Sequence, residues 1–115
     1  MIDFACKQFD LDEIIKCALS LSKADLKIMK FLMKNDEKSF TSEELSKKLE
    51  LDITTVQRGV KKLNEKDVLL RQQKNLGGGG YLFYYRIKGK KAINELIMGI
   101  VHRWVGKVEA ELKGI

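Results

Sequence analysis

Apolar residues recur at three- and four-residue steps in five segments of the chain, a spacing that is typical of helices with one buried face. These segments cover residues 11–19, 23–35, 41–50, 53–66 and 90–113. Two shorter runs, residues 68–73 and 81–87, are instead enriched in Val, Leu, Phe, Tyr and Ile, which favour strands. The pattern therefore predicts a mainly α-helical protein with a small β-hairpin before its long last helix.

Capping residues stand in front of the first four predicted helices. Three of these caps are Asp10, Ser22 with Asp25 as a capping box, and Asp52. The remaining cap, at the start of the third helix, is the strongest. Thr41 and Glu44 form a full T-x-x-E box there, while Phe40 and Leu45 occupy the two positions of a hydrophobic staple. The start of the third helix is therefore the clearest local signal in the chain.

Residues 41–66 have the pattern of a helix-turn-helix, two short helices joined by a tight turn. The second helix has Ile53, Val56, Val60 and Leu63 on the side that should be buried. Its opposite side carries the polar and basic residues Thr54, Thr55, Gln57, Arg58, Lys61 and Lys62. Gly59 costs this helix about 1 kcal/mol relative to Ala, so we expect it to permit a close approach between helices.

Four consecutive glycines, residues 77–80, separate the two strand-like runs, and we expect a mobile hairpin tip there. They lead into a strand and lack the Gly-Lys-Ser/Thr ending of a nucleotide-binding loop, which argues against a nucleotide site. Residues 39–40 are expected to form a very short strand. Residues 1–9 show no period but carry Phe4 and Phe9, so we expect an arm that docks to cover these two aromatic side chains.

The last helix has more apolar surface than one side of a small domain can readily cover. One stripe along it contains Ile93, Ile97, Ile100, Trp104, Val108 and Leu112. Leu96, Val101 and Val105 widen this stripe. We therefore expect this helix to form a dimer interface with its counterpart in a second chain.

Positive charge is concentrated in one part of the chain. The net charge of all 115 residues is +6, but residues 53–90 contain nine Lys or Arg against Glu65 and Asp67 alone, a net charge of +7. A solvated surface normally mixes charges of both signs. The excess in this block therefore favours a polyanionic partner.

The remaining chemistry is sparse. Cys6, Cys17 and the single histidine, His102, do not make a zinc site, which needs about four ligands, so we expect free thiols and no metal. A redox role for the two thiols stays open. No nucleophile motif or paired carboxylates point to an enzyme, and no cofactor is expected. The sequence lacks a 20-residue apolar run and a signal peptide, so we expect a cytoplasmic protein without a membrane partner.

The run from Leu45 to Leu69, LSKKLELDITTVQRGVKKLNEKDVL, and the order of predicted elements resemble the winged-helix DNA-binding domains of archaeal and bacterial regulators. The resemblance is closest to small, single-domain members of the TrmB-like and MarR-like families and extends from about residue 11 onward. It implies one winged-helix domain over residues 1–115, with its helix-turn-helix at about 41–66, its wing at about 68–88 and a dimerisation helix at about 90–113. Two positions depart from the pattern: Glu50 stands where the turn often has Gly, and the glycine tip of the wing lacks the usual Arg or Lys.

The resemblance also implies that the helix at about 53–66 enters the major groove of double-stranded DNA, where its first two turns face base edges. The expected base contacts are Thr54, Thr55, Gln57 and Arg58. Phosphate contacts are expected from Lys61, Lys62 and Lys66 and, on the two strands of the wing, from Lys74 and Arg86. The function expected is that of a homodimeric, sequence-specific transcriptional regulator, with no small-molecule effector assigned.

Two other functions fit the same pattern. One is a winged-helix module that binds protein and not DNA, and the other is an RNA-binding winged helix. Aromatic residues of the second wing strand could stack on exposed bases, although core packing of Phe83 and Tyr85 is the simpler interpretation.

Overall fold

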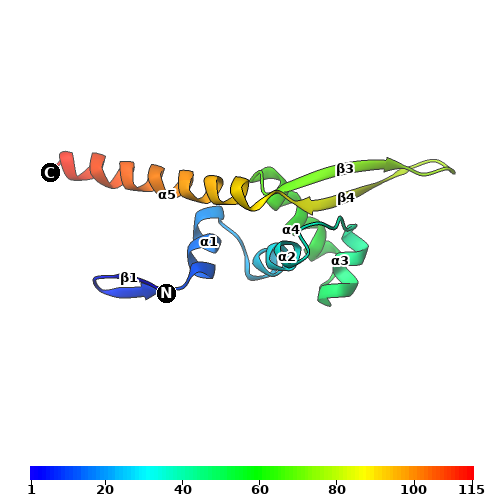
Figure 1. Ribbon diagram of the computed structural model, residues 1–115, viewed down its shortest axis with the longest axis horizontal. Helices are drawn as coiled ribbons and strands as arrows, with labels where there is room; N and C mark the ends of the chain where they lie inside the picture. The colour runs from blue at the N-terminus through cyan, green and yellow to red at the C-terminus, as the bar shows by residue number, and fades with distance from the viewer. The chain divides into compact units, whose positions relative to one another are not determined.

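The computed structural model describes residues 1–115, and Figure 1 shows the course of the chain. Its elements are β1 (Ile2–Phe4), β2 (Lys7–Phe9), α1 (Leu11–Leu19), α2 (Lys23–Lys34), α3 (Ser42–Leu49), α4 (Ile53–Glu65), β3 (Leu69–Asn75), β4 (Tyr81–Ile87) and α5 (Lys90–Lys113). This order confirms the predicted fold class. The chain divides into two compact units, Met1–Ser20 with Lys90–Ile115, and Leu21–Gly89. Whether the 115 residues make one domain stays a prediction.

The predicted helix caps are confirmed. The side chains of Asp10, Ser22, Thr41 and Asp52 each accept a hydrogen bond from a first-turn N–H. In the third cap, Thr41 Oγ1 accepts from the Glu44 N–H at 3.2 Å and Glu44 Oε1 accepts from the Thr41 N–H at 3.0 Å. These bonds satisfy N–H groups that the helix itself leaves unpaired, so each helix starts where its sequence indicates.

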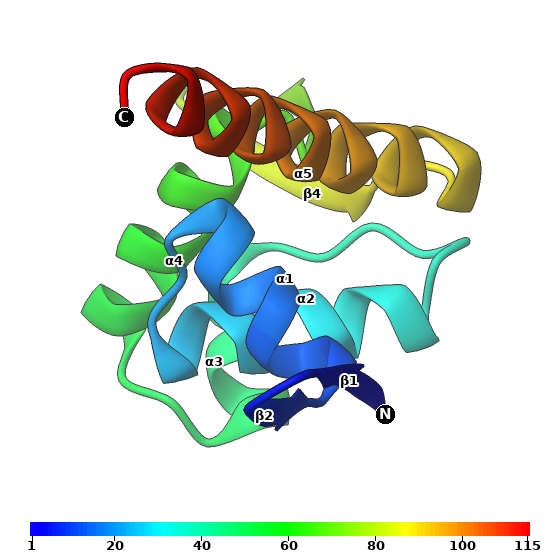
Figure 2. The ribbon, with the colours of Figure 1, turned by 90° about the vertical axis from the view of Figure 1, so that its left-hand side faces the viewer.

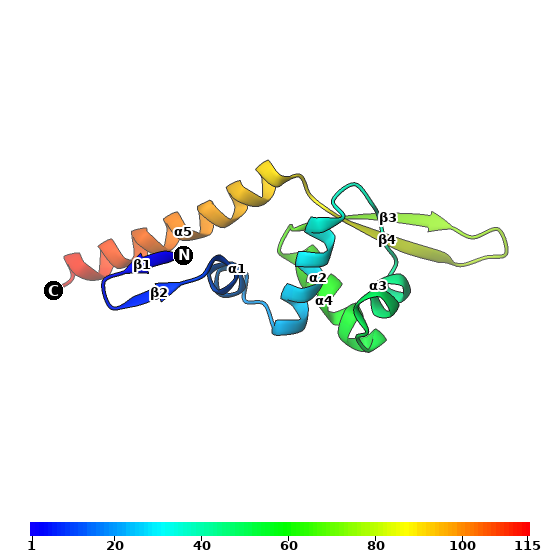
Figure 3. The same cartoon turned by 60° about the horizontal axis from the view of Figure 1, so that its bottom comes forward.

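The core of the unit Leu21–Gly89 is built around α2. Ile28, Met29 and Leu32 of α2 are completely buried, because this helix is apolar around most of its circumference. α4 packs along α2, and α3 packs against both (Figure 3). Neighbouring elements contribute the buried side chains Leu45, Val56, Val60, Leu63 and Val68. α4 is thereby held by its apolar side, which leaves its polar side exposed.

The hairpin β3–β4 is joined to the helices by a third, one-residue strand. The Phe40 N–H donates to the Tyr85 carbonyl and the Tyr85 N–H donates to the Phe40 carbonyl, each at 2.8 Å. This pairing confirms the short strand predicted at residues 39–40. Leu69 and Ile87 pair at the base of the hairpin and are buried there, so the base is fixed while the tip extends away (Figure 1).

The turn between α3 and α4 keeps its usual geometry without glycine. Glu50 adopts the left-handed conformation, with φ 54° and ψ 43°, at the position where such turns favour Gly. This conformation costs a non-glycine residue about 1–2 kcal/mol. The turn is closed by the Leu51 N–H, which donates to the Ser46 carbonyl at 3.1 Å, and by the Ser46 hydroxyl, which donates to the Leu51 carbonyl at 2.6 Å.

Gly59 permits the close contact of α2 and α4, as predicted. A Cβ atom at this position would lie 2.6 Å from Ile28 Cδ1 and 3.1 Å from Asp25 Oδ1. The first distance is shorter than any normal contact of a Cβ atom and the second is tight, so a larger residue would have to displace the Ile28 side chain or move one helix away from the other.

The unit formed by Met1–Ser20 and Lys90–Ile115 contains the packed pair α1 and α5. Ile15 and Leu19 of α1 are buried, and so are Ile93 and Ile97 near the start of α5. Every residue of α5 from His102 to its end is exposed. The helix is thus covered only over its first half within one chain.

Residues 1–9 differ from the expected irregular arm, because they form an antiparallel hairpin that leads directly into α1 (Figure 2). The register pairs Ile2 with Phe9 and Phe4 with Lys7. Strands of three residues are too short to show a period in sequence, which is why the pattern missed them. The expected docking is also not found within the chain, since the Phe4 side chain is 61% exposed.

No helix combines the length and the apolar character that crossing a bilayer requires.

Candidate nucleic-acid interface

The exposed side of α4 presents a row of polar and basic side chains. Thr54, Gln57, Arg58 and Lys61 are exposed, whereas Val56, Val60 and Leu63 on the other side are buried. Residues three and four positions apart lie on one helix face, so Thr54, Arg58 and Lys61 form a continuous line. Thr55 is half-buried and lies toward the side of Lys62, which makes it the least accessible of the four predicted base contacts.

The N-terminus of this helix is fixed by Asp52, whose carboxylate accepts a hydrogen bond from the Thr54 N–H at 3.0 Å. Thr54 and Arg58 occupy the first two turns that follow. A reading helix needs a rigid start, because the direction of its first side chains depends on it.

Lys62 takes part in an ion pair inside the protein. Its Nζ lies 3.1 Å from Oδ2 of Asp25 on α2, whose side chain is 6% exposed, while that of Lys62 is 41% exposed. The Ser22 N–H also donates to the Asp25 carboxylate, at 2.9 Å. The charge of Lys62 thus compensates a buried carboxylate, and the phosphate contact expected of Lys62 stays a prediction. We therefore assign Lys62 to the packing of α2 against α4.

The surroundings of Asp25 act on its pKa in opposite directions. Burial raises the pKa of the carboxyl, but hydrogen bonds from the Ser22 backbone, from Lys62 and from the Ser22 side chain, together with the charge of Lys62, bring it below its ordinary value. A carboxyl with a lowered folded-state pKa stabilises the protein above its unfolded-state pKa of about 3.9. This contribution is lost as the pH falls through the lowered folded-state pKa.

Replacing Lys62 by Met should lower the free energy of unfolding at pH 7 by roughly 1–2 kcal/mol, because the buried Asp25 carboxylate loses its counter-charge. The loss stays below the 3–5 kcal/mol of a fully buried pair, since Lys62 is partly solvated. Urea unfolding measures the difference. It should shrink in acid, where the Asp25 carboxyl is protonated in the folded protein.

The matched control is Lys61→Met, which removes the same charge from the exposed side of α4. We expect a change of no more than about 0.5 kcal/mol in the free energy of unfolding. Equal losses for the two variants would contradict a structural role for Lys62.

The register of β3 and β4 divides the hairpin side chains between two faces. One face carries Leu70, Gln72, Lys74, Leu82, Tyr84 and Arg86. Lys74 and Arg86, which were expected to contact phosphates from the two strands of the wing, thus share one face of the hairpin. Lys74 Nζ lies 4.7 Å from the Tyr84 ring centroid, and Arg86 Nε donates to the Asp36 carbonyl at 3.1 Å. The Arg86 side chain is thereby tied to the segment between α2 and α3, and Lys74 remains the more available cation.

Arg71 is a further candidate that the sequence did not single out. It lies on the opposite hairpin face, with the buried Leu69 and Tyr85, and its guanidinium lies 4.4 Å from the Phe83 ring centroid. Side chains alternate between the two faces of a strand, so Arg71 shares the face of Leu69. The sequence did not show that the strand begins at Leu69, so this face could not be assigned. Because its side chain is held against a ring and is exposed, Arg71 can present charge in a defined direction.

A shallow groove of about 250 Å³ separates this hairpin face from the helices. It is lined by Thr41, Ser42 and Glu43 of the α3 start, by Ile53, Gln57 and Val60 of α4, and by Tyr81, Leu82, Phe83 and Tyr85 of β4. Gln57 therefore lies at the corner between the exposed side of α4 and the hairpin. The groove has polar and aromatic walls, which suit the edge of a nucleic-acid backbone or a base.

The hairpin tip carries no charge. Gly79 and Gly80 have φ of 98° and 81°, values that favour glycine, and the Leu76 N–H donates to the Gly80 carbonyl at 3.0 Å. The cations of the hairpin lie before and after this loop, in the strands. Any contact that needs charge must therefore come from the sides of the hairpin.

The residues predicted for the dimer interface fall into two groups. Ile93 and Ile97 are buried within one chain, and Ile100 is half-buried. Trp104, Val108 and Leu112 are exposed. Ile93 and Ile97, which were predicted for the dimer interface, instead pack inside their own chain. The surface left for a second chain is the C-terminal half of α5.

Comparison with known proteins identifies a family. A family model described as the DnaD N-terminal domain matches residues 9–108. The uncharacterized protein MJ1503 from Methanocaldococcus jannaschii is 22% identical over 104 residues, which cover 90% of this chain and 77% of that protein.

Solved structures are also similar. A possible transcriptional regulator from Methanosarcina mazei Go1 superimposes with a TM-score of 0.94 and 49% identity, over 99% of this chain and 95% of that chain. The homodimeric winged helix-turn-helix DNA-binding domain of Mb0332 from Mycobacterium bovis, a possible ArsR-family regulator, gives a TM-score of 0.52 at 17% identity, over 84% and 88% of the two chains. At that identity the second likeness shows the fold alone, which is a winged helix-turn-helix.

Proposed function

Since this chain belongs to the DnaD N-terminal domain family and exposes a polar, basic face on α4, we propose that it is a sequence-specific double-stranded DNA-binding transcriptional regulator. It acts as a homodimer in the cytoplasm, by binding and not by catalysis. The similar protein from Methanosarcina mazei is described as a possible transcriptional regulator, which supports the proposal. Among winged-helix regulators, the order of elements favours a place near the TrmB-like and MarR-like proteins.

The observation that carries this proposal is the line Thr54, Arg58 and Lys61 on the exposed side of a helix whose other side is completely buried. An α-helix fits the major groove, and residues in its first two turns reach base edges. Arg58 would pair with guanine and Gln57 with adenine, each contact contributing about 1–3 kcal/mol of discrimination. Thr54 completes the reading set, while Thr55 makes a smaller contribution because it is half-buried.

Phosphate contacts would come from both elements beside the reading face. Lys61 and Lys66 follow along α4, and Lys74 and Arg71 lie on the two faces of the hairpin. Such contacts fix the register of the protein on DNA without reading its sequence. In a homodimer, the two α4 helices would lie about 34 Å apart, one turn of DNA, and so select a near-palindromic site.

The two other functions that fit the sequence would give different results in binding experiments. A winged-helix module for protein partners would not bind duplex DNA even at low salt, despite the net charge of +7 in residues 53–90. An RNA-binding module would prefer RNA in a direct competition with duplex DNA. The linear row on α4 favours DNA, because the deep, narrow major groove of duplex RNA does not admit a reading helix.

Replacing Arg58 by Ala should reduce the preference for the target site over random duplex by roughly 5- to 150-fold for each half-site, since a base contact contributes about 1–3 kcal/mol of discrimination. The matched variant Lys74→Ala should weaken binding to target and random duplexes by the same factor. Fluorescence anisotropy on both duplexes at one salt concentration gives, for each variant, the ratio of its affinities for target and random duplex. Equal losses on both duplexes for Arg58→Ala would remove it from the reading set.

A further inference from the structure

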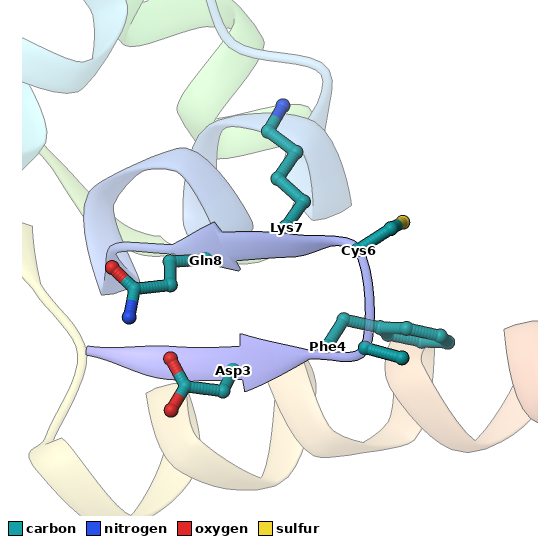
Figure 4. Close-up of a pocket in the computed structure, with 6 residues that line it drawn as sticks. Asp3, Phe4, Cys6, Lys7 and Gln8 are labelled. Atoms are coloured by element: carbon teal, nitrogen blue, oxygen red, sulfur yellow. The ribbon is translucent and has the colours of Figure 1, made fainter.

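The N-terminal hairpin has one apolar face that nothing in its own chain covers. Its register places Ile2, Phe4, Lys7 and Phe9 on one face and Asp3 and Gln8 on the other. Ile2 is 50% exposed and Phe4 is 61% exposed. In Figure 4, Phe4 and Cys6 lie at the turn of the hairpin, with the Phe4 ring extending past it.

A hairpin of two three-residue strands is not stable in water without a surface to pack on. The internal support here is modest. Lys7 Nζ lies 5.0 Å from the Phe9 ring centroid, and the remaining apolar side chains have solvent beside them. A partner surface is therefore required.

The exposed half of α5 offers a surface of matching character. Trp104, Val108 and Leu112 follow one another at four-residue steps, and Trp104 is 57% and Leu112 61% exposed. Together with Lys107, Glu111 and Ile115 they line a shallow, largely apolar hollow along the helix. This surface continues the half of α5 that is already packed, so it extends an existing apolar stripe.

We propose that the N-terminal hairpin of one chain packs on the C-terminal half of α5 of a second copy, and that two such contacts, related by a two-fold axis, form the main part of the dimer interface. Neither surface is covered in its own chain, and both belong to the same compact unit. The proposal rests on the proposed homodimer and specifies which segments form it.

The available area agrees with a stable dimer. An aromatic side chain buries roughly 150–250 Å² when it is fully covered. Each chain offers two on these surfaces, Phe4 and Trp104, together with the smaller exposed side chains of Ile2, Val108, Leu112 and Ile115. The two contacts can therefore bury on the order of 1,000 Å². That area is near the lower limit for a specific interface between two proteins. The interface would therefore be sensitive to single substitutions at its centre.

Complementation between two damaged chains tests the proposal. Phe4→Glu and Trp104→Glu are each expected to raise the dimer dissociation constant about tenfold or more in sedimentation experiments, because each homodimer then has two damaged contacts. Mixing the two variants should restore dimer formation in part. In the mixed dimer, one intact hairpin meets one intact α5. Met33→Glu, a substitution on α2 at a residue of similar exposure, is the control and should dimerise as the unmodified chain does.

The outcomes separate the alternatives. If Phe4→Glu dimerises normally, or if mixing restores nothing because the hairpin covers α5 of its own chain, the proposal is overturned. If the unmodified chain is a monomer, both this proposal and the homodimer fail. DNA binding is measured separately. If Phe4→Glu dimerises normally and still binds duplex DNA, the proposed interface fails but the proposed function stands.

Discussion

Replacing Gly59 by Leu is expected to lower the free energy of unfolding by roughly 3 kcal/mol or more, a large part of the 5–15 kcal/mol that stabilises a small domain. The first added atom would already lie 2.6 Å from Ile28 Cδ1 and 3.1 Å from Asp25 Oδ1. Ile28 is completely buried and cannot move aside without disturbing the core. The larger side chain would therefore separate α2 from α4 and disturb the Asp25–Lys62 ion pair.

Gly106 provides the matched control for this prediction. It also lies inside a helix, α5, but nothing stands within 4 Å of the Cβ that a larger residue would add. Gly106→Ala should therefore raise the free energy of unfolding by up to about 1 kcal/mol, while Gly59→Ala lowers it despite the same gain in helix propensity. Urea unfolding of the two Ala variants measures the sign of the change in the free energy of unfolding for each. A stabilising Gly59→Ala would contradict the close packing of α2 and α4.

Much of this fold follows from local signals in the sequence. The cap formed by Thr41 and Glu44, the glycine at residue 59 and the one-residue strand at Phe40 were each predictable. The cap depends on residues three positions apart, whereas the glycine and the short strand are marked by residue type and take their place through contacts with Ile28 and Tyr85. Such signals act before tertiary packing forms, and packing here reinforces them.

Other features depend on contacts between distant residues and were not predictable. Lys62 has the same helical spacing as a phosphate contact, but its partner Asp25 comes from another helix. Lys74 and Arg86 were assigned without knowing the strand register, which alone decides the hairpin face of each. Similarly, Ile93 and Ile97 belonged to one apolar stripe with Trp104, and only packing within the chain separates them.

The affinity for duplex DNA should fall by roughly 10³–10⁵ between about 50 and 200 mM salt, because a dimer that contacts phosphates with about eight cations releases their counterions. The cations expected to do so in each chain are Lys61, Lys66, Arg71 and Lys74, which are all exposed. Lys62 is not counted because it is paired with Asp25. Lys61→Met should reduce the slope of log affinity against log salt by about two per dimer, while Lys62→Met changes it less.

The central claim is that this protein reads the sequence of duplex DNA through α4. The most direct test is to select binding sites from a random duplex pool and compare the affinity of the selected and random duplexes at about 50 and 200 mM salt. We expect a near-palindromic site with half-sites about one helical turn apart, bound at least about 10³-fold more tightly than random duplex at both salt concentrations. Failure to bind any duplex at the lower salt concentration, or equal affinity for selected and random duplexes, would contradict it.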